Sequence, residues 1–192
     1  MSMPVKEPVC YLMVMDYEIR DAKTTDAEAV AHLYTDGWRF AYQGLIPQNY
    51  LDSLNAEARV SYWEKTLSEP IHLRKSIRKV ACDENRQVLG VISFGADREP
   101  ESGAAEIYTL YARPEKAGQG VGYSLMNHAV VELQKAGYQQ VILWVLQGND
   151  LAQNFYTRQG FTFTGKTRED VIEATVLCDL QMSRPLMTSG YL

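Results

Sequence analysis

The hydrophobic and polar positions of this chain repeat with two different periods, which predicts a mixture of strands and helices. Strands are predicted where apolar and polar residues alternate, or where short apolar runs end at turn residues. They span residues 17–20, 78–82, 87–95, 105–112, 141–146, 161–164 and 172–182. Helices, with apolar residues three and four positions apart, are predicted after Thr25, at 47–54, 57–67 and 149–158, and in a segment ending at Lys135.

Three local signals refine these elements. Thr25 and Glu28 have the spacing of a capping box, so we expect the first helix to begin there. Asn149 is expected to cap the helix that runs to Arg158. The run 141–146 is apolar at nearly every position, which predicts a central strand buried on both faces.

The composition fits one globular domain. The 192 residues are 46% hydrophobic and 22% charged, and neither a linker nor an internal repeat divides them. The alternation of strands and helices predicts an α/β fold around a mixed sheet. We expect the domain at 17–186, after an N-terminal extension at 1–16 and before a short tail at 187–192.

Charge, cysteine and histidine content argue against several classes of function. The formal net charge is −5 and Lys and Arg do not cluster, so nucleic acid is not an expected partner. Three widely spaced cysteines predict no disulfide framework and fit a reducing cytoplasm. His32, His72 and His128 show no metal-ligand spacing, so no metal site is expected. No apolar run approaches the ~20 residues of a membrane helix, so no membrane association is expected.

A glycine-rich loop precedes the helix that ends at Lys135. Gly118, Gly120 and Gly122 follow a predicted strand and open the helix. Glycine lets the backbone approach an anion, and free amides at a helix start can bind it, so the loop predicts a phosphate site. The dinucleotide-binding fingerprint does not fit, because Tyr123 stands where its last glycine would be and no acidic residue follows at the expected distance.

A second glycine pattern has the letters of a nucleotide-binding P-loop. Residues 160–167 read Gly-Phe-Thr-Phe-Thr-Gly-Lys-Thr. A P-loop follows a buried strand and opens a helix. This segment instead follows the predicted helix at 149–158, and its alternating bulky residues favour a strand. A P-loop nucleoside triphosphatase is therefore the least supported of the functions considered.

In this order, the motifs resemble the GCN5-related N-acetyltransferase (GNAT) superfamily. The strand 105–112, the turn 113–115 and the loop with Gly120 and Gly122 are similar to the family's Gln/Arg-x-x-Gly-x-Gly/Ala segment. Ala117 stands where the family has Gln or Arg. Further along, residues 149–161 are similar to the family's Asn-x-x-Ala-x-x-Phe-Tyr and Gly-Phe pair. The resemblance covers most of the chain and rests on two motifs in the expected order.

The resemblance implies both a fold and a cofactor. The implied fold is a twisted, mostly antiparallel sheet of about 6–7 strands, flanked by helices and splayed at an acyl-CoA cleft. The implied cofactor is acetyl-CoA, held largely by backbone groups. The positions implied to bind it are Leu110, Tyr111, Ala112, Ala117, Gly118, Gln119, Gly120, Val121, Gly122, Tyr123, Ser124, Asn149, Ala152 and Tyr156.

The resemblance also implies which residues carry the chemistry. Tyr156 matches the family's tyrosine that protonates the leaving thiolate. Glu106 stands where the family often has a glutamate that takes the amine's proton through water. Trp38 and Tyr42 resemble an aromatic stretch of a bacterial subgroup, and we expect them to line the acceptor site. Tyr108, two residues after Glu106, is expected to share its face of the strand.

The expected activity is transfer of an acetyl group from acetyl-CoA to a primary amine by direct attack on the thioester. The amine would belong to a small molecule or to a peptide N-terminus. The alternative is a non-catalytic module that binds acyl-CoA. A homodimer could form if the strand 172–182 is an exposed edge.

Overall fold

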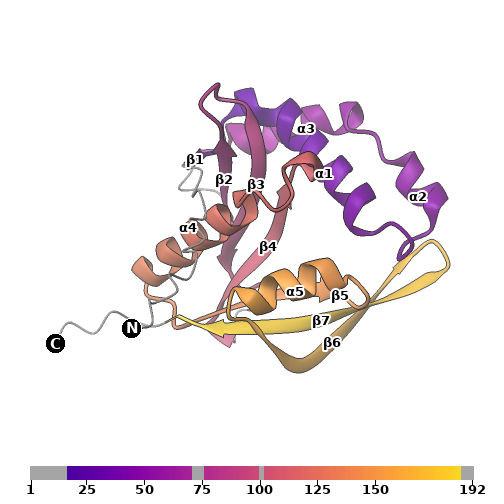
Figure 1. Cartoon of the computed structure of the whole chain (residues 1–192), viewed down its shortest axis with the longest axis vertical. Coiled ribbons are helices and arrows are strands. Elements are labelled where there is room, and N and C mark those ends of the chain that lie inside the picture. The colour runs from indigo at the N-terminus through magenta and orange to yellow at the C-terminus, as the bar shows by residue number, and fades with distance from the viewer. Residues whose placement is uncertain (1–16, 71–75, 100–101, 187–192) are drawn as a thin grey trace, which may run out of the picture.

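The computed structural model describes residues 17–70, 76–99 and 102–186 (Figure 1). The expected N-terminal extension at 1–16 and tail at 187–192 lie outside the described residues. In chain order the elements are β1 (Glu18–Asp21), the 3₁₀ helix η1 (Thr24–Asp26), α1 (Ala27–Ala41), α2 (Gln48–Ser53), α3 (Glu57–Ser68), β2 (Ile77–Cys82), β3 (Val88–Ala96), β4 (Ala105–Ala112), the 3₁₀ helix η4 (Pro114–Lys116), α4 (Val121–Lys135), β5 (Gln140–Leu146), α5 (Asp150–Arg158), β6 (Thr162–Ile172) and β7 (Thr175–Pro185).

One mixed sheet runs through the molecule. Its 7 strands follow the order β1-β2-β3-β4-β5-β7-β6. Among the described strands, β4 and β5 form the one parallel pair, and all other neighbours are antiparallel. The predicted α/β fold with a mixed, mostly antiparallel sheet is therefore confirmed. The apolar run at 141–146 forms most of β5, which lies between β4 and β7 and is largely buried, as expected.

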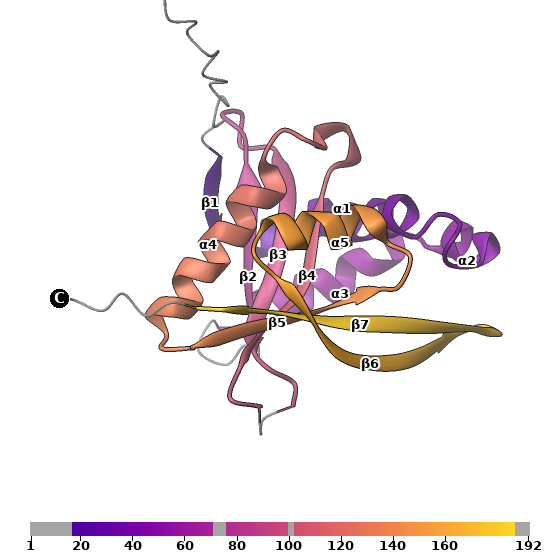
Figure 2. The same cartoon turned by 60° about the horizontal axis from the view of Figure 1, so that its bottom comes forward.

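Helices cover both faces of the sheet (Figures 1 and 2). Leu125 of α4 and Phe155 of α5 contact one hydrophobic core, whereas Trp63 of α3 belongs to another, which α1 completes. The neighbouring residues Val80 and Ala81 of β2 point into these two different cores, as successive residues of a strand must. None of the described helices is long and apolar enough to span a membrane.

β4 and β5 separate partway along their length. β4 pairs with β3 throughout residues 105–112, but it pairs with β5 only over residues 105–107. β5 meanwhile stays paired with β7 along residues 140–146. From Tyr108 onward, the edge of β4 on the β5 side has no strand partner in the described part of the chain. The sheet is therefore splayed between β4 and β5, as the resemblance implied.

An extra residue interrupts the regular pairing of β4. Opposite β3, Ser93 pairs with Thr109 and Phe94 pairs with Ile107, so Tyr108 is inserted as a β-bulge. A bulge changes the phase of the strand, because side chains otherwise alternate between its two faces.

The bulge determines which side chains of β4 face each helix layer. Ala105 and Ile107, before the bulge, contact the core beneath α4, and Leu110 and Ala112, after it, contact the same core. Tyr111 contacts the other core, beneath α1. Odd and even positions therefore exchange faces at the bulge.

The last two described strands, β6 and β7, form a long hairpin (Figure 2). The strands predicted at 161–164 and 172–182 are therefore wrong in their bounds, since the chain turns at 173–174 instead. β6 is exposed at almost every position and so lacks the apolar alternation on which strand prediction depends. β6 and β1 are the two edge strands of the sheet, whereas β7, which holds most of 172–182, is paired on both sides.

The segment with P-loop letters lies in this hairpin. Gly160 (φ 82°) follows α5, and Gly165 (φ 84°) lies where the pairing of β6 with β7 shifts between Phe163 and Thr167. Lys166 belongs to the strand, and no helix begins there. The P-loop reading is therefore excluded, as its context suggested.

The first helix begins differently from the prediction. α1 follows directly on η1, with Asp26 at its N-terminal cap, so the capping box of Thr25 and Glu28 is wrong. The Asp26 carboxylate accepts hydrogen bonds from the amide of Lys23 (2.8 Å) and from both terminal nitrogens of Arg20 (2.7 and 2.8 Å). This buried ion pair joins the helix start to β1.

Candidate active site

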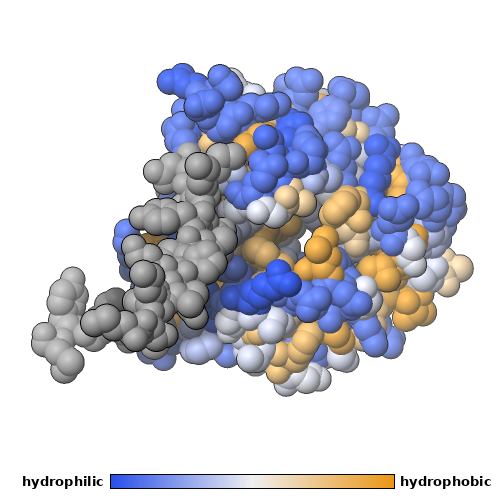
Figure 3. Space-filling view, viewed as in Figure 1, coloured by the Kyte–Doolittle hydropathy of each residue, from blue (hydrophilic) through white to orange (hydrophobic). Residues whose placement is uncertain are grey.

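The opening between β4 and β5 is the candidate active site. Leu110, Tyr111 and Ala112 lie on the edge of β4 that β5 leaves unpaired. The space-filling view shows the surface hollowed in the middle of this face, between α1 and α5, with hydrophobic residues around the hollow (Figure 3). Peptide-like chains bind such strand edges through main-chain hydrogen bonds. The geometry therefore suits the amide-containing arm of a cofactor.

The glycine loop leads into the start of α4. Gly118 (φ 75°) and Gly120 (φ 88°) both adopt the left-handed backbone conformation that favours glycine. The amide of Ser124 donates to the carbonyl oxygen of Gly120 at 2.9 Å. The amides of residues 121–123 precede this bond, so they are the unpaired donors of the helix N-terminus. Such a helix start binds phosphate groups.

The amides of the loop are not equivalent. Those of Ala117, Gln119 and Ser124 donate to carbonyl groups of the same segment, at 3.0, 3.2 and 2.9 Å. The side chain of Val121 is buried in the core beneath α4, whereas Tyr123 is 54% exposed. Residues 117–124, which were predicted to bind the cofactor, therefore divide into residues that shape the loop and residues whose amides are available to a ligand.

Tyr17 fixes the loop from outside. Its hydroxyl group donates to the carbonyl oxygen of Gln119 at 2.8 Å, across a sequence separation of 102 positions. Sequence reasoning missed this contact, because a single tyrosine at the start of a strand carries no signal for a distant loop.

α5 brings Asn149 and Tyr156 to the cleft. Asn149 caps the helix as predicted, since its side-chain oxygen accepts from the amide of Ala152 at 3.1 Å. The ring of Tyr156 packs edge-to-face against Phe155 and Phe161, with centroids 5.4 and 6.0 Å apart. Burial raises the pKa of Tyr156, so its hydroxyl group keeps its proton at neutral pH.

Tyr156 is one of four partly buried tyrosines, with Tyr34, Tyr42 and Tyr111, that come from α1 and its C-terminal end, β4 and α5. The rings of Tyr34 and Tyr111 lie 4.9 Å apart, and Tyr42 and Tyr111 are close enough that each affects the pKa of the other. The hydroxyl oxygen of Tyr34 is 2.6 Å from Oγ1 of Thr109. Burial raises the pKa of each of these tyrosines, that of Tyr34 to about 12. These four hydroxyl groups therefore keep their protons at neutral pH.

The expected acceptor wall is an aromatic cluster at the C-terminal end of α1. Trp38 lies 4.9 Å from Tyr42 and 6.3 Å from Tyr50 of α2, between ring centroids. Asn49 donates to both carboxylate oxygens of Glu173 (3.2 and 3.0 Å), which joins α2 to the tip of the β6–β7 hairpin. The sequence suggested the aromatic residues but not the hairpin tip, because β6 was not predicted at its true length.

Glu106 is 1% exposed and is ion-paired with Arg98 of the β3–β4 connection. Nε of Arg98 lies 3.1 and 3.0 Å from the two carboxylate oxygens, Nη2 binds one of them, and the Arg98 amide donates at 3.3 Å. The Arg98 guanidinium also lies over the ring of Tyr108, 5.5 Å from its centroid, and the Tyr108 hydroxyl donates to the carbonyl of Ala96.

Glu106 and Tyr108 are thus neighbours of the same guanidinium. The bulge at Tyr108 means that simple alternation does not place them on one face, although the sequence suggested it. Sequence reasoning missed Arg98, which lies in a polar connection without a recognisable motif.

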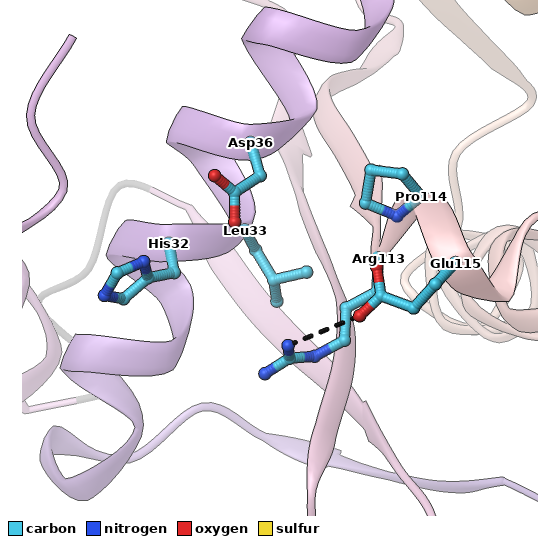
Figure 4. A pocket seen from close by; sticks show the side chains of 6 residues that line it. All are labelled: His32, Leu33, Asp36, Arg113, Pro114 and Glu115. Carbon is cyan, nitrogen blue, oxygen red and sulfur yellow. Dashed lines mark ion pairs between the residues drawn. The ribbon is translucent and has the colours of Figure 1, made fainter.

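The outer side of α1 carries pockets separate from this cleft. One is lined by His32, Leu33, Asp36, Arg113, Pro114 and Glu115, with Arg113 and Glu115 ion-paired at 3.6 Å (Figure 4). The ligating atoms of His32, Glu28 and Glu57 lie within 4.8 Å of one another, although the spacing in the sequence suggested no such group. His32 and Tyr34 are on opposite sides of the helix, so this group does not face the cleft.

These features define a class of protein. A splayed sheet with a free strand edge, a glycine loop at a helix start and a partly buried tyrosine are the features expected of a site for a long, phosphate-bearing acyl cofactor. Comparison with known proteins agrees. The family model described as Acetyltransferase (GNAT) family matches residues 28–161. The chain therefore belongs to the GNAT acetyltransferase family.

Individual relatives fit this assignment. The chain is 31% identical over 132 residues to an uncharacterized N-acetyltransferase, YuaI, of Bacillus subtilis, covering 68% of this chain and 72% of the relative. It is 24% identical over 160 residues to a spermidine N(1)-acetyltransferase of Thermoplasma acidophilum, covering 82% and 96%. The crystal structure of PaiA N-acetyltransferase from Thermoplasma acidophilum in complex with coenzyme A matches with a TM-score of 0.70 and 21% identity, covering 89% and 99%. The predicted acetyl-CoA-dependent acyltransferase is confirmed at the level of the family.

Proposed function

We propose that this protein transfers the acetyl group of acetyl-CoA to a primary amine of a small molecule or a peptide N-terminus, by direct attack of the amine on the thioester. The observation that carries the proposal is the unpaired edge of β4 beside the glycine loop. This edge and the free amides of α4 together match the two parts of coenzyme A, a peptide-like arm and a pyrophosphate.

The cofactor would lie along these two elements. The amides of residues 121–123 would hold the pyrophosphate, and Leu110, Tyr111 and Ala112 would pair with the arm. Asn149 uses its side-chain oxygen to cap α5. It therefore retains its amide nitrogen as a donor for the arm.

The reaction places negative charge on two atoms in turn. The thioester oxygen becomes negative when the amine attacks, and a backbone amide near Leu110 or Tyr111 would stabilise it. The sulfur becomes negative when the carbon–sulfur bond breaks, and the protonated hydroxyl of Tyr156 would donate to it. Glu106 would accept the proton that the ammonium form of the acceptor loses.

The acceptor side is suited to a cationic amine. The rings of Trp38, Tyr42 and Tyr50 offer faces that attract ammonium groups. A relative at 24% identity is named a spermidine acetyltransferase, which supports an amine of this kind without specifying it.

Location and assembly follow from two smaller observations. Cys82 and Cys178 are free thiols, which supports a reducing cytoplasm. If the protein forms a homodimer through the sheet, β6 would be the pairing edge.

Thermal unfolding with acetyl-CoA, followed by a thiol-release assay over a panel of amines, tests the proposal. Ligand at about 100 times Kd should stabilise the fold by ~2.7 kcal/mol. For a chain of this length, each kcal/mol raises Tm by ~2–4 °C, so a shift of several degrees is expected. A shift together with amine-dependent thiol release supports the enzyme. A shift without release for any amine would identify the non-catalytic module instead, and the absence of a shift would overturn the cofactor site.

A further inference from the structure

The carboxylate of Glu106 is fully engaged by one residue. Both of its oxygens accept from Arg98, through Nε, Nη2 and the backbone amide. Glu106 is 1% exposed, whereas the side chain of Arg98 is 57% exposed. The guanidinium therefore stands between a buried negative charge and the solvent.

The phase of β4 places Glu106 on the side of the sheet that α1 and α3 cover. Ala105 and Ile107 face α4, so Glu106 between them faces the opposite layer. After the bulge, Thr109 contacts Tyr34 of α1 and so faces that same layer. Glu106 thus lies on the same side of β4 as Thr109 and Tyr111, which contact Tyr34 of α1. Trp38 of the aromatic cluster follows Tyr34 by one turn of the same helix.

A base at this position must first lose its partner. A carboxylate that already accepts several hydrogen bonds from a cation has no free position for an incoming amine. A buried carboxylate also cannot remain unpaired without a large cost in stability. Both constraints are met if another cation replaces the guanidinium, because the negative charge of Glu106 then always has a positively charged partner.

The structure permits this exchange by side-chain movement alone. The Arg98 side chain is more than half exposed, so it can turn into solvent while its backbone amide still donates to Glu106. Its other contact, with the ring of Tyr108, would be equally available to an ammonium group.

We propose that Arg98 is a specificity-determining residue of the acceptor site: its guanidinium occupies Glu106 until the ammonium group of a cationic acceptor displaces it. The inference rests on the proposed function and narrows it. The acceptor binds in its charged form, so aliphatic primary amines and polyamines fit the site, and amines that are neutral at physiological pH do not.

The proton balance of this exchange is complete. Bound ammonium gives a proton from nitrogen to an oxygen of Glu106, and the nitrogen lone pair forms a bond to the thioester carbon. The carbon–sulfur bond then breaks, sulfur takes a proton from Tyr156, and Tyr156 regains one from the new amide nitrogen. Glu106 releases its proton to solvent when Arg98 returns, so one ammonium yields one amide, one thiol and one proton.

Arg98→Gln tests the displacement directly. Removing the competing cation should lower KM for an aliphatic diamine at least threefold and leave KM for acetyl-CoA unchanged. Arg20→Gln is a matched control, since Arg20 also forms a two-nitrogen ion pair with a buried carboxylate, that of Asp26. It should lower thermal stability but change neither KM. A diamine KM that rises or stays constant in Arg98→Gln would overturn the proposal.

Two further variants and a second readout separate the proposed role of Arg98 from a loss of folding. Arg98→Lys keeps a positive charge but loses the guanidinium group that binds both carboxylate oxygens. Its diamine KM should lie between those of the wild-type protein and Arg98→Gln. In Arg98→Ala, added guanidinium ions should inhibit competitively against the diamine. If all three variants fail to fold, Arg98 is structural and the proposal is wrong.

The wild-type protein separates this inference from the proposed function. If the wild-type protein releases thiol with amines while the Arg98 variants show no change in the diamine KM, the acetyltransferase activity is supported and the displacement of Arg98 is wrong. If it releases no thiol with any amine, both fall together.

Discussion

The ring of Tyr111 lies directly against Gly37 of α1. A Cβ added at Gly37 would be 2.4 Å from Cδ1 and 2.9 Å from Cγ of that ring. α1 can approach β4 here only because residue 37 has no side chain. Tyr111 also contacts the ring of Tyr34, about one turn earlier on α1, with the ring centroids 4.9 Å apart. The position of one aromatic residue at the cleft thus depends on a glycine in the neighbouring helix.

Gly37→Ala is expected to destabilise the protein, although the same change within a helix normally stabilises it by up to ~1 kcal/mol. The overpacking against Tyr111 costs about 1–3 kcal/mol, so a net loss of about 1 kcal/mol and a fall in Tm of ~2–4 °C should follow. Gly122→Ala in α4 is the control, because its Cβ would meet Phe155 at an ordinary 3.5 Å. A Tm for Gly37→Ala at or above wild type would contradict the packing described.

Tyr156→Phe removes only a hydroxyl group from a ring that packs on Phe155 and Phe161. If that hydroxyl donates to the leaving sulfur, kcat should fall at least ~10-fold while KM for acetyl-CoA changes little. Steady-state thiol release measures both. Tyr62→Phe, at a residue 61% exposed on α3, should behave as wild type. Unchanged turnover in Tyr156→Phe would remove the tyrosine from the mechanism.

Substitutions at Asn149 separate its two roles. Asn149→Ala removes the hydrogen bond to the amide of Ala152 and should cost about 1 kcal/mol of stability. Asn149→Ser keeps a capping oxygen but loses the amide nitrogen, so stability should be nearly retained. If that nitrogen binds the cofactor, both variants raise KM for acetyl-CoA. A normal KM in Asn149→Ser would show that the residue only caps the helix.

The stability of the protein should depend on Asp26 in acid. Burial alone would raise the pKa of Asp26, but hydrogen bonds from Arg20 and Lys23 lower it below the ordinary value of 3.8. A carboxyl group that is more acidic when folded stabilises the fold above its ordinary pKa, and this contribution is lost as the pH falls through the folded pKa.

Asp26→Asn should therefore lower the free energy of unfolding at neutral pH by about 2 kcal/mol, and the difference from wild type should shrink below pH 3.8. Urea unfolding across the acid range measures it. Asp36→Asn is the control, because Asp36 is half exposed and 4.0 Å from Arg39. A difference that stays constant with pH would show that Asp26 stabilises the fold without its charge.

The order of elements and the glycine loop before α4 could be predicted from the sequence, because both depend on short-range patterns. Gly118 and Gly120 adopt positive φ as the loop required, and Asn149 caps α5. The run 141–146 is buried on both faces because its residues leave no polar side for solvent.

The errors arise where the pattern of apolar and polar residues within one element does not determine its structure. Asp26, not Thr25, begins the first helix because Arg20 of β1 holds its carboxylate. β6 was underestimated because an exposed edge strand needs no apolar alternation. The bulge at Tyr108 appears only in the register against β3. None of these is visible within a window of neighbouring positions.

The hydrogen bond from Tyr17 to Gln119 also bears on folding order. The glycine loop is built from local hydrogen bonds, but the hydrogen bond that holds it from outside comes from Tyr17, 102 positions earlier in the chain. β1 is an edge strand that pairs with β2 alone. The glycine loop can therefore gain this support only after the first strand has joined the sheet. A truncation that removes Tyr17 should leave the helices intact and loosen the loop that we propose binds the pyrophosphate.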